Sequence, residues 1–157
     1  MNLESKSIQP WLTLVARLFI AAIYLYATVS KIGNVSENVK AVQVYKILPT
    51  TLARYFGYSL PWLELGLVLL LVFGVSMRFT AAATAFLSIL YLVAISSAWA
   101  RHLPINCGCF GTGGVTADGK VHPLIYLREI GINTLDLLLA IYLWYRPFGK
   151  WGLDKSK

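Results

Sequence analysis

The sequence predicts an all-α protein, an integral membrane four-helix bundle with further interfacial helices in its first loop. Hydrophobic residues make up 57% of the chain and charged residues only 13%, whereas soluble domains average about 45–50% and about 25%. Four segments are also apolar over the roughly 20 residues that a helix needs to cross a bilayer. This composition excludes a disordered chain, and it leaves too little polar surface to cover an ordinary soluble enzyme.

The four membrane helices are expected within a single domain that comprises residues 1–157. Their approximate ranges are 11–31, 60–77, 79–100 and 124–145. Pro10 and Pro61 stand at the start of the first two, as suits a proline at the first position of a helix. The second and third helices are joined only by residues 77–79, which predicts an antiparallel hairpin. Aromatic residues near the helix ends are typical of the headgroup boundary, and they are Trp11, Trp62, Trp99, Trp144 and Tyr145.

The two longer connections differ in character. Residues 33–59 mix apolar and basic side chains, and we expect two short amphipathic helices in the membrane interface, separated at Pro49. Residues 101–122 are rich in glycine and contain both cysteines. An even number of crossings puts both termini on one side, but the basic residues divide equally between the sides and do not decide the orientation. The net charge of +7 fits contact with anionic lipids rather than nucleic-acid binding, for which no compact basic domain exists.

Cys107 and Cys109 are the only cysteines of the chain. With Gly108 between them, their Cα atoms fall near the window of about 4.4–6.8 Å that a disulfide requires. So small a ring is strained, and strained, exposed disulfides are the labile or catalytic kind. Two other interpretations stay open. Two thiolates with His102 and His122 could bind Zn²⁺ or Cu⁺, or the pair is a structural clip or two free thiols.

Charged residues in the expected helices are candidates for function, because a charge at the bilayer centre costs at least about 2.5–3.5 kcal/mol. Helical spacing gives two polar stripes: Arg17, Ala21, Tyr24, Thr28 and Lys31 in the first helix, and Glu129, Asn133 and Asp136, with Arg128 at the edge, in the fourth. From their depth, we expect Lys31 to pair with Glu64. Arg17 is expected to pair with Asp136 or to reach solvent.

The same charges suggest how the cysteine loop works. If Glu64, Arg128 and Glu129 gather beneath it, a cation lowers the pKa of a thiol and a carboxylate carries protons during a two-electron exchange. The candidate catalytic residues are therefore Cys107, Cys109, Arg128 and Glu64. The candidates for lining a quinone pocket are Trp62, Tyr24 and Thr28. Buried ion pairs can also simply fix helix packing, and that interpretation stays open.

Several short motifs together resemble one known family. They are Ala16-Arg17-Leu18-Phe19, Val29-Ser30-Lys31, Leu48-Pro49, Leu60-Pro61-Trp62-Leu63-Glu64 and Asn106-Cys107-Gly108-Cys109-Phe110-Gly111. With them the chain resembles the small four-helix membrane proteins of the DoxX-like group, and within it the branch of the methylamine-utilisation protein MauE. The resemblance implies a prokaryotic plasma-membrane protein with an extracytoplasmic cysteine loop and cytoplasmic termini. It also implies a redox role beside a thioredoxin-like partner, with quinone or sulfur redox enzymes as partners in the wider group.

Two classes of function follow from these observations. In the first, the cysteine pair exchanges thiols and disulfides with a secreted or thioredoxin-like protein, with quinone as a second redox partner. In the second, the protein is a non-enzymatic membrane anchor or maturation subunit for a redox partner, and its loop docks that partner or holds a metal. A transporter is disfavoured, because the placement of glycine and proline does not suggest discontinuous helices.

Overall fold

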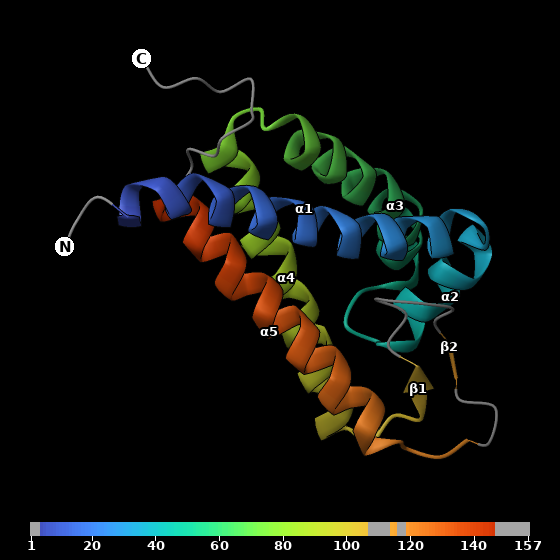
Figure 1. The fold of residues 1–157 in the computed structure, drawn as a ribbon. Helices are drawn as coiled ribbons and strands as arrows, with labels where there is room; N and C mark the ends of the chain where they lie inside the picture. Colours follow the sequence, from blue (N-terminus) through green and yellow to red (C-terminus); the bar gives the residue numbers. More distant parts are fainter. Residues whose placement is uncertain (1–3, 107–113, 116–118, 147–157) are drawn as a thin grey trace.

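The computed structural model describes residues 4–106, 114–115 and 119–146, which are mostly helical (Figure 1). In chain order the elements are α1 (Glu4–Ile32), α2 (Val35–Val44), α3 (Thr50–Phe73), α4 (Met77–Ala100), β1 (Ile105–Asn106), β2 (Gly114–Val115) and α5 (Pro123–Tyr145). The two strands are two residues long and pair antiparallel. The long helices therefore set the architecture.

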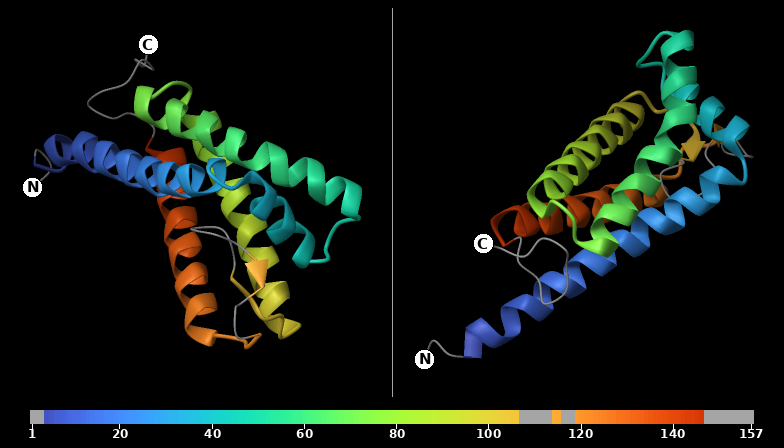
Figure 2. Two further views of the ribbon diagram at one scale, coloured as in Figure 1. Left: turned by 90° about the vertical axis from the view of Figure 1, so that its right-hand side faces the viewer. Right: turned by 90° about the horizontal axis from the view of Figure 1, so that it is seen from above.

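The helices form two groups that diverge from each other. α1 lies along α3, and α2 folds back against α3, while α4 and α5 pack against each other. α3 and α4 are joined by a short turn, yet they contact each other little and separate beyond it (Figure 2). A main apolar core joins α1, α3, α4 and α5. A second core, at the other end of α4, contains Tyr45, Ile95, Ala98, Ile105 and Tyr126.

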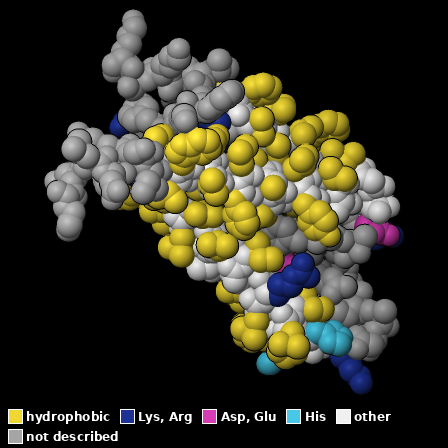
Figure 3. Space-filling view, viewed as in Figure 1, with side chains coloured by type: hydrophobic (Ala, Val, Ile, Leu, Met, Phe, Trp, Pro, Cys, Tyr) yellow, Lys and Arg dark blue, Asp and Glu magenta, His cyan; other side chains and the backbone are white. Residues whose placement is uncertain are grey.

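Among the residues that the structure describes, three helices are long and apolar enough to cross a bilayer. They are Gln9–Ile32, Thr50–Phe73 and Met77–Ala100, with 24 residues each and a mean hydropathy of 1.8 or 1.9. Large apolar side chains stand exposed along them (Figure 3), which suits a surface in lipid rather than water. α5 is similar in length, with 23 residues, but it carries Arg128, Glu129 and Asp136. The chain is an all-α membrane protein, and this prediction is confirmed.

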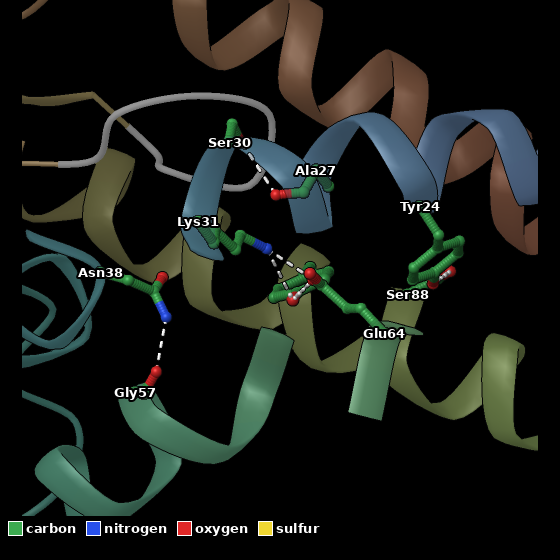
Figure 4. A network of polar contacts seen from close by, with 9 residues as sticks. Tyr24, Ala27, Ser30, Lys31, Asn38, Gly57, Glu64 and Ser88 are labelled. Carbon is green, nitrogen blue, oxygen red and sulfur yellow. Dashed lines mark hydrogen bonds and ion pairs between the residues drawn. The ribbon is translucent and has the colours of Figure 1, made fainter. Parts of the chain in front are cut away.

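The second half of the first loop differs from the prediction. Only α2 forms a separate short helix there, because the segment after Pro49 begins α3 and continues through Pro61 without a break. A proline inside a helix lacks the N–H that would bond the carbonyl four residues earlier, here that of Gly57. Asn38 of α2 supplies a donor in its place, since its Nδ2 donates to the Gly57 carbonyl at 2.6 Å (Figure 4). The expected second interfacial helix is therefore the first part of α3.

The close approach of α2 to α3 also depends on Gly57 having no side chain. A Cβ atom at this position would lie 2.7 Å from the Cα of Val39. Glycine therefore lets the α2 backbone come near enough for Asn38 to reach the free carbonyl.

Two further helix boundaries differ from those expected. α1 already begins at Glu4 and contains Pro10 in its interior rather than at its start. α3 ends at Phe73, because Gly74 adopts a left-handed conformation with φ 65° and caps the helix. The turn between α3 and α4 therefore comprises residues 74–76 and not residues 77–79.

Candidate functional site

A column of polar side chains occupies the interior of the bundle. Three helices contribute residues with the spacing i, i+4, i+7, which places each set on one helix face: Tyr24, Thr28 and Lys31 of α1, Thr84, Ser88 and Tyr91 of α4, and Glu129, Asn133 and Asp136 of α5. Glu64 of α3 joins them, and all except the half-buried Tyr91 are buried. Seven residues of helix span about 10 Å, so the column covers a substantial part of a bilayer core.

Lys31 and Glu64 form the ion pair that the sequence predicts. Lys31 Nζ lies 2.5 Å from Glu64 Oε1, and the two side chains are only 3% and 0% exposed. The Tyr91 hydroxyl donates to the same Glu64 oxygen, and Lys31 Nζ donates to the Tyr91 hydroxyl at 3.3 Å. Figure 4 shows Lys31 and Glu64 pointing toward each other from α1 and α3. One charged cluster therefore links α1, α3 and α4.

Within the described part of the chain, no cation forms an ion pair with Asp136. Its Oδ2 lies 2.6 Å from the Ser88 hydroxyl, which in turn lies 3.5 Å from the Tyr24 hydroxyl. Ser88 also donates to the backbone carbonyl of Thr84 at 3.0 Å. Tyr24 and Ser88 point toward each other from α1 and α4 (Figure 4). A hydroxyl network therefore joins α1, α4 and α5 at this level.

Glu129 lies two turns before Asp136 on α5. Its side chain is buried and the neighbouring Arg128 is exposed, and the charges of Arg128 and Lys31 both act on the Glu129 carboxylate. Glu129 Oε2 and Glu64 Oε2 are buried without a hydrogen-bond partner among the described residues. The structure thus brings Glu129 near Lys31, the partner of Glu64, and leaves Arg128 at the edge of the group.

Arg17 behaves differently from both predicted alternatives. Its side chain is 3% exposed, so it does not reach solvent, and Lys31–Glu64 is the sole ion pair among the described residues. Instead Arg17 Nη2 donates to the backbone carbonyl of Val72 at 3.3 Å. Val72 lies in the last turn of α3, where helix carbonyls have no partner within the helix. The Arg17–Asp136 expectation is therefore wrong, because a helix end supplies the acceptor.

Cys107 and Cys109 lie outside the described residues, but the chain on either side of them is described. Asn106 pairs with Gly114 and Ile105 pairs with Val115. Ile105 is buried in the second core. The strand pair therefore brings together the two ends of the segment that contains the cysteines.

The segment that leads to the cysteines is held by contacts from three helices. Arg101 Nη2 donates to the Tyr45 carbonyl at the end of α2 at 2.5 Å. The buried hydroxyl of Tyr126 in α5 donates to the Leu103 carbonyl at 2.7 Å, and its ring stacks on Trp99 of α4 with centroids 6.0 Å apart. The residues before β1 are thus fixed to the bundle.

The two histidines of the alternative metal site stand on the surface near this segment. His102 follows α4, and His122 precedes α5, and both are exposed. Within the part of the chain that the structure describes, no group of three or more His, Cys, Asp and Glu side chains could hold a metal ion. The cysteines that this hypothesis needs lie outside that part, so it stays a prediction.

The three candidate quinone residues have different environments. Tyr24 is 4% and Thr28 0% exposed within the column, whereas Trp62 is 64% exposed on α3. A mostly apolar cavity of about 290 Å³ lies between α2, α3 and α4, with Lys31 and Tyr91 in its lining. None of the three quinone candidates is among the described residues that line it.

The chain matches one known protein family along most of its length. The sequence profile of the family described as "Methylamine utilisation protein MauE" matches residues 9–146. The chain belongs to the MauE family. This range runs from the start of the apolar part of α1 to the end of α5, so it includes the whole polar column and the cysteine segment.

Individual MauE proteins are similar along most of the chain. A methylamine utilization protein MauE of Methylorubrum extorquens is 34% identical over 88% of this chain and 72% of its own length. That of Methylophilus methylotrophus is also 34% identical, with the same coverage, and that of Paracoccus denitrificans is 29% identical over 85% of this chain and 70% of its own. No solved structure matches.

Sequence reasoning missed the contribution of α4 to the column. The spacing of Thr84, Ser88 and Tyr91 is the same as that of the polar stripes of α1 and α5. Hydroxyl groups in an apolar helix are, however, a weaker signal of a functional site than charged groups. The repeat of one spacing in three helices was the available signal.

Proposed function

We propose that this MauE-family protein exchanges thiols and disulfides through Cys107 and Cys109. In this proposal the cysteines lie on the extracytoplasmic side of a prokaryotic plasma membrane, α5 is the fourth crossing, and both termini are cytoplasmic. The observation that carries it is that the only two cysteines of the chain are separated by a single glycine. The anchored segment before β1 supports it, because a fixed base keeps a reactive pair in a constant position for a partner.

The proposed exchange has two steps that balance in electrons and protons. One thiolate of the reduced pair attacks a partner disulfide, which forms a mixed disulfide and releases a partner thiolate that takes up a proton. The second cysteine attacks the mixed disulfide, so that a Cys107–Cys109 disulfide closes and the second partner thiol leaves. Two electrons thus pass to the partner, and the reverse sequence oxidises a partner dithiol.

Arg128 and Glu64 have separate roles in this proposal. Arg128 is exposed at the start of α5, where its charge is available to stabilise a thiolate. Glu64 has one oxygen bound to Lys31 and Tyr91 and a second oxygen without a described partner. That free oxygen is the proposed acceptor for a proton released during exchange.

The names of the relatives indicate a pathway. Three similar proteins are named for methylamine utilization, and we propose the same setting here, with a secreted or thioredoxin-like disulfide protein as the partner. None of Tyr24, Thr28 and Trp62 is among the residues that line the cavity between α2, α3 and α4, and no step of the proposed exchange is assigned to quinone. If the reduced protein reduces added quinone, and the variant Cys107→Ser/Cys109→Ser does not, quinone would be established as a second partner.

Capture of a mixed disulfide from native membranes tests the exchange. Cys109→Ser and Cys107→Ser each leave one thiol that can attack but cannot resolve, so at least one variant should accumulate a covalent adduct that a reductant releases. The double variant Cys107→Ser/Cys109→Ser is the matched control and should form none. Growth on methylamine of a host that lacks its own MauE should fail with the same variants.

Two outcomes contradict the exchange. Full growth with the double-serine variant shows that the protein is a non-enzymatic anchor or maturation subunit. Stoichiometric zinc or copper in the purified protein, lost in His102→Ala and His122→Ala, shows a metal-holding loop instead.

Alkylation kinetics of the cysteines test the role of Arg128. Arg128→Ala should shift the pH dependence of alkylation to higher pH, because a nearby cation favours the thiolate. Arg78→Ala, at the other end of the bundle in the first turn of α4, is the control and should leave it unchanged. An identical profile in the two variants removes Arg128 from the proposal.

A further inference from the structure

Ser88 links Asp136 to the other hydroxyl groups of the column. Ser88 Oγ lies 2.6 Å from Asp136 Oδ2, 3.0 Å from the Thr84 carbonyl and 3.5 Å from the Tyr24 hydroxyl. A serine hydroxyl carries one hydrogen, so Ser88 can donate either to Asp136 or to Thr84. When it donates to Thr84, the 2.6 Å contact is a hydrogen bond only if Asp136 carries a proton and donates it to Ser88.

The surroundings of Asp136 favour the same neutral form. Its side chain is 2% exposed, and its Oδ1 is buried without a partner among the described residues. The hydroxyls of Thr28 and Thr84 are likewise buried and unpartnered. An ionised carboxylate in such a place would be buried without a counter-charge among the described residues, which is costly.

Few titratable or charged groups face Asp136 from the helices around it. From α1 this is Tyr24, whose hydroxyl lies 3.5 Å from Ser88 Oγ, the group bonded to Asp136. Glu64 of α3 acts on the same Tyr24, but its charge is offset by Lys31. The one charged residue of α4 is Arg78, at the end of the helix far from Ser88, and Glu129 lies two turns away on α5 itself.

We propose that Asp136 is an intramembrane proton-binding site that exchanges its proton through the hydroxyls of Ser88 and Tyr24. Ser88 lies near the middle of α4, a helix long enough to span the bilayer, so the site lies at membrane depth. Tyr24, Thr28 and Lys31 follow one face of α1 toward Glu64, whose Oε2 is free to accept a proton. The ligand of this site is the proton, and the site does not depend on the cysteine chemistry.

Infrared spectroscopy of the full chain in lipid nanodiscs tests the proposal. A protonated carboxylic acid has a C=O stretching band that the carboxylate lacks. At neutral pH the wild type should show this band and Asp136→Asn should lose it, while Glu37→Gln, which changes an exposed carboxylate on α2, should retain it. In D₂O the band should shift as deuterium replaces the proton, and Ser88→Ala and Tyr24→Phe should slow that shift.

Unfolding by detergent shows whether the Asp136→Asn variant is correctly folded. Asparagine has the shape of a neutral aspartic acid, so Asp136→Asn should unfold in the same detergent titration range as the wild type. A wild type without the acid band, or a band that survives Asp136→Asn and is lost in Glu129→Gln, overturns the proposal. Loss of the band on adding sodium or potassium ions at constant pH also overturns it, because a metal cation then occupies the site.

Discussion

Glu64 and Asp136 are both almost completely buried in the same bundle, but the groups around them are opposite in kind. Glu64 meets a lysine ammonium at 2.5 Å and a tyrosine hydroxyl, whereas the hydrogen-bond partner of Asp136 among the described residues is the Ser88 hydroxyl. A buried charge is tolerated when it is paired and hydrogen-bonded. The comparison therefore separates a carboxylate that is paired with a lysine and joins three helices from the carboxyl group that we propose holds a proton.

The largest effect is expected when the charged side of this comparison is broken. Lys31→Met leaves Glu64 buried without its cation, and removing one partner of a buried pair costs about 3–5 kcal/mol of the free energy of unfolding. Titration with a denaturing detergent in mixed micelles measures this loss. Lys40→Met, which changes an exposed lysine of α2, is the control and should have little effect.

A double variant shows whether the pair or the lone charge matters. Lys31→Met/Glu64→Leu removes both charges together, and replacement of a buried pair by apolar residues is often nearly neutral. The double variant should therefore be more stable than Lys31→Met alone. If it is equally unstable, the cost comes from lost packing and the electrostatic comparison with Asp136 fails.

A smaller effect is expected when a hydrogen bond to Glu64 is removed and its cation stays. Tyr91→Phe deletes the hydroxyl that donates to Glu64, and hydrogen bonds to charged groups contribute about 1.5–3 kcal/mol. The same detergent titration should show a loss in this range. Tyr58→Phe, at an exposed position of α3, is the matched control, and equal stability of the two variants would contradict the assigned bond.

The comparison of satisfied and unsatisfied groups extends to the backbone at Gly57. Asn38→Leu removes the donor to the Gly57 carbonyl, and a buried acceptor without a partner costs about 1–3 kcal/mol. Pro61→Ala restores an N–H that can bond this carbonyl within α3. In the Pro61→Ala background, Asn38→Leu should therefore cost less than in the wild type, and an unchanged cost would show that Asn38 acts through packing alone.

How much the sequence could predict follows from where each signal lies. The apolar segments, the stripes of α1 and α5 and the Lys31–Glu64 pair follow from composition and helical spacing, which are local properties. The continuous α3 did not, because a proline is read as a helix start unless its missing hydrogen bond is compensated. That compensation comes from Asn38 in another helix, and the local sequence around Pro61 does not predict it.

The polar column was only partly predictable for a similar reason. Arg17 was expected to pair with a carboxylate or to reach solvent, but a backbone carbonyl at the end of α3 accepts its hydrogen bond. A backbone acceptor is present whatever the side chain, so the sequence does not indicate which helix end will bind Arg17. Asp136 finds its hydrogen-bond partner, Ser88, on a helix that contains one charged residue. Such pairings depend on how helices cross, which helical spacing does not fix.

The smallest expected effect concerns Tyr24, at the edge of the Asp136 group. Its hydroxyl lies 3.5 Å from Ser88, a distance at which a hydrogen bond is weak, so Tyr24→Phe should lower the free energy of unfolding by about 0.5 kcal/mol or less. This loss is to be compared with that of Tyr91→Phe, since both variants remove one tyrosine hydroxyl from the same column. A loss as large as that of Tyr91→Phe would mean that Tyr24 bonds to a charged acceptor. Asp136 would then be ionised, and its difference from Glu64 would disappear.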